Sequence, residues 1–508
     1  MLTILQFDAA SASLLDRLLS DDRLPTLGRL RDRGVWRELD APATQFAAGA
    51  QHTLYSGVEI EDHGLFYPFQ WDPTEQRVHY MGHFDAPPPV WEGLGREHGT
   101  RTLAIDPYES RAPAEAPPGT LVCGWQLHDR VVLQEWASPG GAHRRLEKLF
   151  GPPQPVDEVF GRHSVDEMLG LRRRLLGAPG RVAEAAELLL AEDSFDLAWL
   201  TFCAAHVAGH QFWDLSQLDP AGLDAGSERV LGSTLEDVYV AVDHALGRVI
   251  ESLPAGNDLM VISPVGMDVN TSRADLLPEM LAAVLDPPDP NAPAGDPSGN
   301  RSSIWWLRAA LPSGLRAKVA NALPEKATLE LTARLEMRGV DWSSTRAFAH
   351  PAENQGYIRL NMRGRERDGI VEPDQADALM DEIATGLTTF TGLDGRPAVK
   401  SVEKVRERFG SGDRSHLLPD LIVKWVDTPA TQLEGLRSER FGTVYRQGVG
   451  SGRSGNHTEG DAWALIVPGS SSLVEPSRPP RLEDISATAA AMSGADTSDM
   501  VGVSLLEP

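Results

Sequence analysis

The chain alternates short apolar segments with longer amphipathic ones along most of its length. LTILQFD (2–8) and DLMVISP (258–264) have the length and the apolar content of buried strands. GRVAEAAELLLAED (180–193) and TLEDVYVAVDHALGRVIESL (234–253) instead repeat apolar residues at helical spacing. Strands that alternate with helices are typical of parallel sheets whose crossover helices cover both faces. We therefore expect an α/β fold with a mostly parallel, doubly wound central sheet.

The remaining strand-like segments suggest how the chain is divided. A loop rich in Pro, Gly, Asp and Asn occupies residues 285–300, and the segment from there to about 345 has helical rather than strand signals. We therefore predict an α/β core formed by 1–270 and 345–508, with a mainly helical insertion or cap at 270–345. The further segments predicted as strands are RTLAIDPY (101–108), GTLVCGWQ (119–126), FDLAWLTFCA (195–204), GYIRLNM (356–362), DLIVKW (420–425) and DAWALIVPG (461–469).

The charge of the chain restricts its partners. The net charge is −26, so nucleic acids and anionic membranes would be repelled and are not expected as partners. The N-terminal segment lacks the basic start of a signal peptide, and no apolar run is long enough for a transmembrane helix. Cys123 and Cys203 are the only cysteines, which fits a reducing compartment, and we expect a cytoplasmic location. The basic segment RGRER (363–367) is expected at the surface.

Two histidines stand out in FCAAHVAGHQFWD (202–214). His206 and His210 are four positions apart, so on a helix they share one face and can share a metal ion. Packed histidines have the same spacing, and the motif alone leaves both interpretations open.

Several segments, in order along the chain, resemble the type I phosphodiesterase/nucleotide pyrophosphatase family of the alkaline phosphatase superfamily. They include LTILQFDAA, HTLYSGVEIEDHGLF (52–66), the segment around His206 and SGNHTEGDAWALIVPG (454–469). The resemblance implies an alkaline-phosphatase-like fold and a two-metal site for phosphoryl transfer. Its ligands and nucleophile would be an Asp after the first strand, a Thr or Ser nucleophile, an Asp-x-x-x-His pair, an Asp-His dipeptide and a late His. Two such ions activate the nucleophile and neutralise the charge that develops on phosphorus.

Part of this constellation is replaced. Counting back from Gly57 to the position of the family's nucleophile reaches Ala47, whose methyl group cannot attack a substrate. Pro264 and Val265 occupy the positions of the Asp-His dipeptide. A shifted register would make Thr44 the nucleophile, which is one alternative.

The other part is retained or exchanged. Asp8 matches the first Asp, His457 matches the late His, and His206 replaces the acid of the Asp-x-x-x-His pair beside His210. The resemblance assigns the pair and the late His to one ion, so His206, His210 and His457 would form a mononuclear three-histidine site. Zinc is the expected ion, with iron or manganese as alternatives.

These residues lead to two functional hypotheses of different classes. The first is a metal-dependent hydrolase or related enzyme that acts on a phosphorylated or otherwise anionic small molecule, with Glu459, Asp461 or Asp8 as proton-transfer groups. The second is a catalytically inactive protein that keeps the fold for binding or scaffolding, as the loss of the nucleophile suggests. A phosphodiesterase that uses Thr44 is a weaker third hypothesis.

Overall fold

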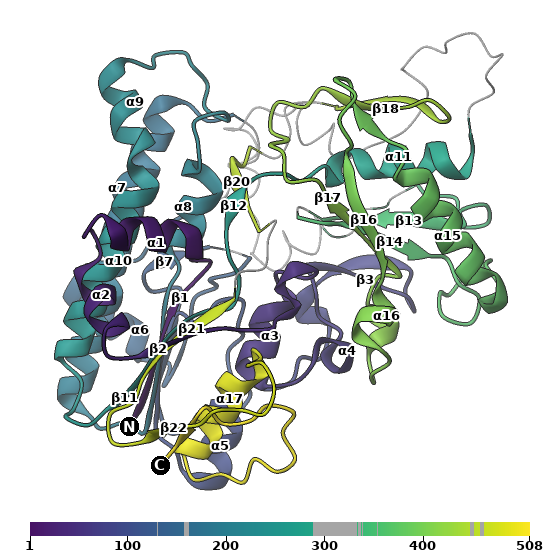
Figure 1. Cartoon of the computed structure of the whole chain (residues 1–508). Helices are drawn as coiled ribbons and strands as arrows, with labels where there is room; N and C mark the ends of the chain where they lie inside the picture. Colours follow the sequence, from purple (N-terminus) through teal and green to yellow (C-terminus); the bar gives the residue numbers. More distant parts are fainter. Residues whose placement is uncertain are drawn as a thin grey trace.

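The chain folds into a large α/β lobe and a smaller lobe beside it, as seen in a computed structural model (Figure 1). The N- and C-termini lie near each other at one end of the large lobe (Figure 1). Among the described residues, no helix combines the length and the apolar character that crossing a bilayer requires. The structure describes residues 1–129, 131–156, 162–287, 333, 337, 339–352, 354–447, 452–457 and 462–508.

The large lobe is built on an eight-stranded mixed sheet with the order β2-β21-β11-β1-β10-β5-β6-β8. Neighbours among the five consecutive strands β11 to β6 pair in parallel, whereas β21, β2 and β8 pair antiparallel at the two edges. The α/β fold expected from the alternating pattern is therefore confirmed. The strands are β1 (Leu2–Phe7), β2 (Val35–Glu38), β5 (Thr102–Ile105), β6 (Gly119–Cys123), β8 (Trp136–Ser138), β10 (Leu197–Phe202), β11 (Asp258–Ser263) and β21 (Trp463–Val467).

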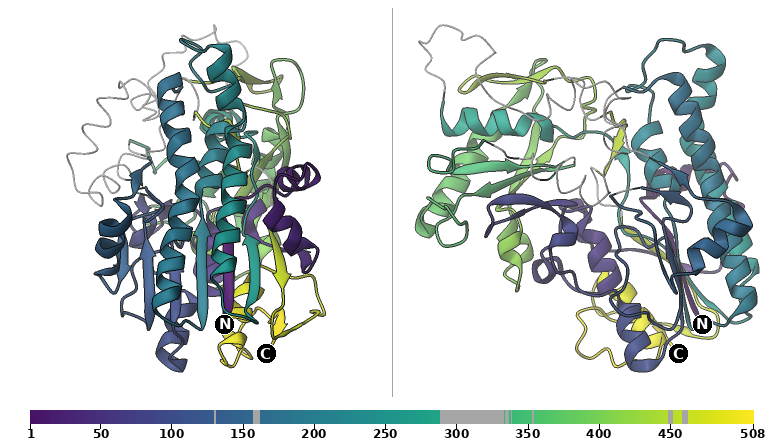
Figure 2. Two further views of the ribbon diagram at one scale, coloured as in Figure 1. Left: turned by 90° about the vertical axis from the view of Figure 1, so that its left-hand side faces the viewer. Right: turned by 180° about the vertical axis from the view of Figure 1, so that it is seen from behind.

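Helices cover both faces of this sheet. On one face the long helices α7 and α10 lie over the sheet and run roughly along its strands, as Figure 2 shows, and they share one apolar core with α1, α2 and α8. On the other face α3, α5 and α17 bury their apolar residues in a second core. The helices are α1 (Ala12–Ser20), α2 (Pro25–Arg31), α3 (Gly49–Ser56), α5 (Val90–His98), α7 (Val165–Glu192), α8 (Ala204–Phe212), α10 (Thr234–Glu251) and α17 (Glu483–Met492).

The smaller lobe has its own antiparallel sheet, in the order β13-β14-β17-β16, and its own apolar core with α11 and α15. The predicted strands in 356–362 and 420–425 belong to this sheet and not to the large one. Most of the predicted insertion at 270–345 lies outside the described residues, so its boundaries stay a prediction. The elements are α11 (Leu277–Leu285), β13 (Ala347–His350), β14 (Gly356–Leu360), α15 (Ala376–Leu387), β15 (Thr391–Gly392), β16 (Val399–Lys404), β17 (Leu421–Trp425), β18 (Gly435–Ser438) and β19 (Gly442–Tyr445).

The basic segment 363–367 was expected at the surface, and this prediction is wrong for Arg365, which is half-buried, and for Glu366, which is buried. Glu366 is buried and pairs with Arg359 at 2.8 Å and with Arg365 at 2.9 Å, because the chain turns these side chains under the second sheet. Arg365 also pairs with Asp420 at 2.8 Å. Buried charges are retained when they are paired, so this network ties the turn to the sheet.

The remaining elements are mostly short and lie outside the two main sheets. They are η1 (Pro42–Thr44), α4 (Ile60–His63), β3 (Phe69–Asp72), β4 (Arg77–Tyr80), η2 (Met81–His83), β7 (Leu127–His128), α6 (Ala142–Phe150), β9 (Gln154–Pro155), α9 (Ala225–Gly232), β12 (Asp268–Val269), η3 (Ala274–Leu276), η4 (Pro373–Gln375), α16 (Val405–Phe409), η5 (Ser415–Leu417), β20 (Gly455–Asn456), β22 (Ser472–Leu473) and β23 (Leu506–Glu507).

The parallel strands bring distant parts of the chain to one edge of the large sheet. Phe7 at the end of β1 pairs with Phe202 at the end of β10, and β11 ends beside them. The residues that follow these strands therefore meet at the carboxyl edge, where ligands of open α/β sheets bind. The two-stranded ribbon of β12 and β20 adds the late segment around residue 456 to the same edge.

Candidate metal centre

Three histidines from two distant segments meet at this edge. Helix α8 begins two residues after β10, so His206 and His210 lie on adjacent turns of one helix face. His457 comes directly after β20. Nε2 of His206 lies 3.2 Å from Nε2 of His210 and 3.0 Å from Nε2 of His457, and all three side chains are buried. The structure thus brings together the three histidines that the sequence indicated.

Glycines allow these segments to approach one another. A Cβ atom on Gly209 would lie 2.6 Å from Cγ of Met267, and one on Gly455 would lie 2.2 Å from the carbonyl oxygen of Gly209. Either side chain would force α8 away from the ribbon that carries His457. The close approach of helix and ribbon therefore depends on the absence of a side chain at both positions.

Each of the three imidazoles uses its Nδ1 atom in a hydrogen bond that points away from the cluster. Two of the acceptors are carbonyl oxygens, which only accept, so the proton of these rings is on Nδ1. The third acceptor is a carboxylate. Such outward bonds fix the orientation of metal-binding histidines and leave Nε2 free for the ion. The bonds run from His206 to Asp8 Oδ2 (2.7 Å), from His210 to Gly455 O (3.1 Å) and from His457 to Gly266 O (2.9 Å).

The protonation of the rings favours a cation between them. Burial lowers the pKa of His210 well below its usual value and, together with the neighbouring His206, lowers the pKa of His457 to about 3. With their protons on Nδ1, these neutral rings direct the lone pairs of Nε2 toward His206. Tetrahedral zinc with Zn–N bonds of about 2.0–2.1 Å separates its nitrogen ligands by about 3.4 Å. The observed separations of 3.2 and 3.0 Å are close to that value, so the residues fit a divalent ion.

Asp8 is fully buried and uses both of its oxygens within the protein. Oδ2 accepts from His206, and Oδ1 accepts from Gln6 at 3.0 Å and Gln51 at 2.7 Å. Burial by itself raises the pKa of a carboxyl group, but the hydrogen bond and charge of His206 and the two amides lower the pKa of Asp8 below its usual value. The ionised carboxylate therefore acts as the acceptor that orients His206.

Tyr108 also reaches the histidine cluster, and the sequence did not single it out. Its ring packs against His206 with 4.7 Å between ring centroids, and its hydroxyl group lies 3.4 Å from Nε2 of His206. It follows β5, whose end lies at the same sheet edge as the end of β10. A search of all predicted strand ends for polar groups would have found this residue.

Glu109 is a second residue that the sequence did not indicate. Its backbone has a positive φ of 56°, an uncommon conformation for a residue with a side chain. One carboxyl oxygen, Oε2, is buried without a hydrogen-bond partner. Burial and the negative charge of Asp8 raise the pKa of Glu109 well above its usual value. The raised pKa makes this carboxyl group a candidate proton donor.

The positions of the missing ligands are apolar and packed. Ala47 and Val265 are buried in the same core, together with Ala9, Ala43 and Ala50. Pro264 is also buried. The family's second metal would find no donor atoms on these side chains.

The hydroxyl groups near Ala47 lack a base. Nδ1 of His63 accepts from the backbone N–H of Leu65 at 3.0 Å, so its proton is on Nε2 and is donated to the hydroxyl oxygen of Thr53 at 3.0 Å. His63 in this state cannot take a proton from Thr53. Thr44 ends η1, and among the described residues no side chain lies within hydrogen-bond distance of its hydroxyl group.

Glu459 and Asp461, the other predicted proton-transfer groups, lie outside the described residues.

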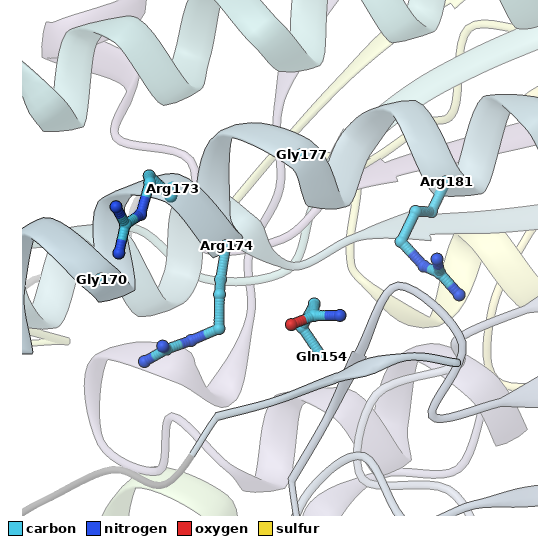
Figure 3. A pocket seen from close by; sticks show the side chains of 6 residues that line it. All are labelled: Gln154, Gly170, Arg173, Arg174, Gly177 and Arg181. Atoms are coloured by element: carbon cyan, nitrogen blue, oxygen red, sulfur yellow. The ribbon is translucent and has the colours of Figure 1, made fainter. Parts of the chain in front are cut away.

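A separate surface hollow of about 440 Å³ lies along α7. Arg174 and Arg181 extend from this helix toward the segment that carries Gln154 (Figure 3). Arg181 already donates to the carbonyl oxygens of Trp125, Phe150 and Gly151. Neither α7 nor β9 contributes a residue to the histidine cluster, so the hollow is distinct from it.

Comparisons with known proteins agree with this architecture. A family model described as type I phosphodiesterase / nucleotide pyrophosphatase matches residues 2–435. Phosphonoacetate hydrolase from Sinorhizobium meliloti 1021, solved with phosphonoacetate, superposes with a TM-score of 0.53 at 14% identity, covering 97% of this chain and 95% of that chain. Murine ectonucleotide pyrophosphatase / phosphodiesterase 5 in complex with AMP superposes with a TM-score of 0.45 at 12% identity, with the same coverage. No curated protein matches the chain by sequence. The alkaline-phosphatase-like fold that the resemblance implied is confirmed.

Proposed function

The chain belongs to the type I phosphodiesterase/nucleotide pyrophosphatase family, and from this premise we propose that it is a hydrolase with a single divalent ion. His206, His210 and His457 would hold the ion, and the substrate would be a small phosphorylated or otherwise anionic molecule. The convergence of three Nε2 atoms whose rings keep their protons on Nδ1 supports this proposal most directly. Three imidazoles suit zinc, with iron or manganese as alternatives.

The replaced half of the family's site restricts the reaction. Ala47 cannot form a covalent intermediate, so hydrolysis in this chain would transfer the group directly to water. When bound, a divalent ion supplies Lewis acidity toward an anionic oxygen of the substrate. The phosphonoacetate hydrolase structure was solved with phosphonoacetate, a small anion of the class we propose.

The chain's own residues have separate tasks in this proposal. Asp8 orients His206 through the hydrogen bond to Nδ1. The hydroxyl group of Tyr108, beside His206, is placed to donate a hydrogen bond to a substrate oxygen. Glu109 would give its proton to the leaving group, with Glu459 and Asp461 as the further candidates from the sequence.

Metal analysis of purified variants tests the metal site. After loading with zinc and removal of free metal, His206→Ala is expected to hold about one ion per chain less than the wild type. His244→Ala, which removes an exposed histidine from α10, is the matched control and should retain the wild-type content. Equal metal content in His206→Ala and the wild type would overturn the proposed site.

A non-catalytic binding protein is the second candidate function. The apolar packing of Ala47 and Val265 favours it, because this packing removes the nucleophile and the second metal together. Zinc-loaded wild type should be assayed on a phosphate monoester, an aryl phosphodiester and a phosphonate, with His206→Ala as the reference. Turnover that depends on His206 supports the enzyme, whereas equal background rates in both proteins support the binding function. Diester turnover that Thr44→Ala abolishes would instead identify Thr44 as the nucleophile.

A further inference from the structure

A second cluster of metal-binding groups lies on the hairpin of β3 and β4 and on the turn η2 that follows it. One ligand atom each from Asp72, Glu75, His79 and His83 lies within 4.8 Å of the others. Nε2 of His83 is 3.0 Å from Oδ2 of Asp72, and Nε2 of His79 is 3.2 Å from Oε2 of Glu75. We propose that these four side chains form a second divalent-cation site, separate from the three histidines and structural in its role.

The hairpin register places the cluster on one face. Asp72 pairs with Arg77 across the strands and Gln70 pairs with His79, so Asp72 and His79 project from the same face. Oδ1 of Asp72 accepts from the backbone N–H groups of Thr74 and Glu75, at 2.7 and 3.1 Å. These bonds fix the turn and leave Oδ2 for the cluster. The carboxylate is therefore oriented before any ion binds.

The two imidazoles limit the charge that the cluster can carry. The rings of His79 and His83 stack with 3.7 Å between centroids and an angle of 8°. The Nε–H group of Arg77 donates to Nε2 of His79, so this nitrogen presents a lone pair to the cluster. His79 is only 2% exposed, so its ring is held in place beneath the cluster. Two imidazoles with two carboxylates are a donor set that zinc and neighbouring divalent metals accept.

Arg77 supplies the positive charge of the cluster in the structure described. Its Nε lies 2.9 Å from Nε2 of His79, and its guanidinium group pairs with Glu75 at 2.5 Å. A divalent ion would replace this guanidinium group, whose side chain is 35% exposed and can turn into solvent. If an ion replaces the guanidinium group, removing the charge of Arg77 should strengthen metal binding. If the cluster is only an ion-pair network, removing this charge should weaken the network without creating a tighter metal site.

The location of the cluster indicates its role. The hairpin is bound to the smaller lobe, because Trp71 N–H donates to His350 and the backbone N–H groups of Arg367 and Asp368 donate to Pro73 O and Gln76 Oε1. An ion on the hairpin would fix its turn and so reinforce this connection. The site contributes no residue to the three-histidine cluster, which agrees with a role in stability.

Zinc titration by calorimetry, with matched variants, tests the second site. His83→Ala should lose one binding event and keep the event that depends on His206, while His206→Ala should show the reverse. Arg77→Met should bind the hairpin ion about tenfold more tightly, a difference of about 1.4 kcal/mol. His98→Ala, which removes an exposed histidine at the end of α5, is the control.

A thermal measurement separates this site from the proposed active site. Zinc should raise the Tm of His206→Ala and should have no such effect on the double variant His206→Ala/His83→Ala. Unchanged stoichiometry in His83→Ala, or weaker zinc binding by Arg77→Met, overturns the hairpin site. If only the three-histidine site is wrong, the wild type still shows the zinc-binding event that His83→Ala removes. The two proposals therefore fail with different results.

Discussion

The carboxylate of Asp8 lies 2.7 Å from Nδ1 of His206, on the side of the imidazole opposite the nitrogen that faces His210 and His457. The resemblance implied a metal ligand at this first-strand position. In this chain the carboxylate instead contacts the cluster through a histidine, and it is fully buried behind that ring. The acid that matches a ligand implied by the resemblance thus orients one of the histidines of the proposed metal site.

Asp8→Asn tests this support. The amide has the shape of the carboxylate but lacks its charge and changes its hydrogen-bonding pattern, so zinc affinity should fall about 10- to 100-fold. Competition with a chelator measures the change, and circular dichroism checks the fold. Asp32→Asn, at an exposed position after α2, is the control. Wild-type affinity in Asp8→Asn would contradict the role assigned to the carboxylate.

Tyr108→Phe tests the hydroxyl group beside His206. The ring contact with His206 remains, so metal content should be unchanged, while kcat/KM for an anionic substrate should fall about tenfold or more because one donor to the substrate is lost. Tyr445→Phe removes an exposed hydroxyl group and serves as the matched control. Full activity of Tyr108→Phe would remove this residue from the proposed reaction.

Gly209→Ala tests the close contact between α8 and the ribbon. Alanine normally favours a helix interior by up to about 1 kcal/mol, but this methyl group would meet Met267 and should lower the free energy of unfolding by about 1–3 kcal/mol. Zinc affinity should fall as well, because His210 would shift. Gly180→Ala on α7 has open space and should be neutral or stabilising. Urea unfolding with chelator titration separates the two effects.

Arg359→Met tests the buried ion pair of the smaller lobe. It removes one of the two guanidinium partners of the buried Glu366, which keeps Arg365 and the indole N–H of Trp71. It also removes the donor to three backbone carbonyl groups, so the free energy of unfolding should fall by about 3–5 kcal/mol. Arg363→Met changes an exposed side chain and should alter it by less than about 0.5 kcal/mol. Chemical unfolding followed by fluorescence measures both values. A small effect of Arg359→Met would show that Arg365 and Trp71 alone compensate the buried carboxylate.

His350→Gln tests the acid sensitivity of the hairpin contact. Burial lowers the pKa of His350 to about 3 from a usual value of 6.5, so between these values the unfolded state binds more protons than the native state. Stability therefore falls as the pH decreases through this window, by up to about 1.4 kcal/mol per pH unit for this one group. The variant should lose less stability than the wild type between pH about 6.5 and about 4.5. His244→Gln should behave as the wild type does, and an unchanged slope in His350→Gln would contradict the assignment.

The sequence predicted the centre of the large sheet well, because β1, β10 and β11 are buried on both faces and have continuous apolar runs. It did not separate the second sheet, since β14 and β17 have the same apolar pattern and a pattern does not identify the partner strand.

Of the residues around the three histidines that the sequence did not indicate, Tyr108 could have been found from its position at the end of a predicted strand. Nothing local could have indicated Glu109 or the contact of Asp8 with His206. The burial of Glu109 and the direction of the imidazole depend on residues far away in the chain.

The apolar packing around Ala47 and Val265 also has an evolutionary consequence. A hydroxyl group at residue 47, or an acid and an imidazole at residues 264 and 265, would each be buried without partners until all were present. One buried polar group without a hydrogen bond costs about 1–3 kcal/mol, which is a large part of the stability of a typical protein. Introducing the second set of ligands that the resemblance implies, one residue at a time, would thus pass through destabilised intermediates. Under the proposal of a single catalytic ion, each such step would lower stability before a second ion could bind, and selection would act against it.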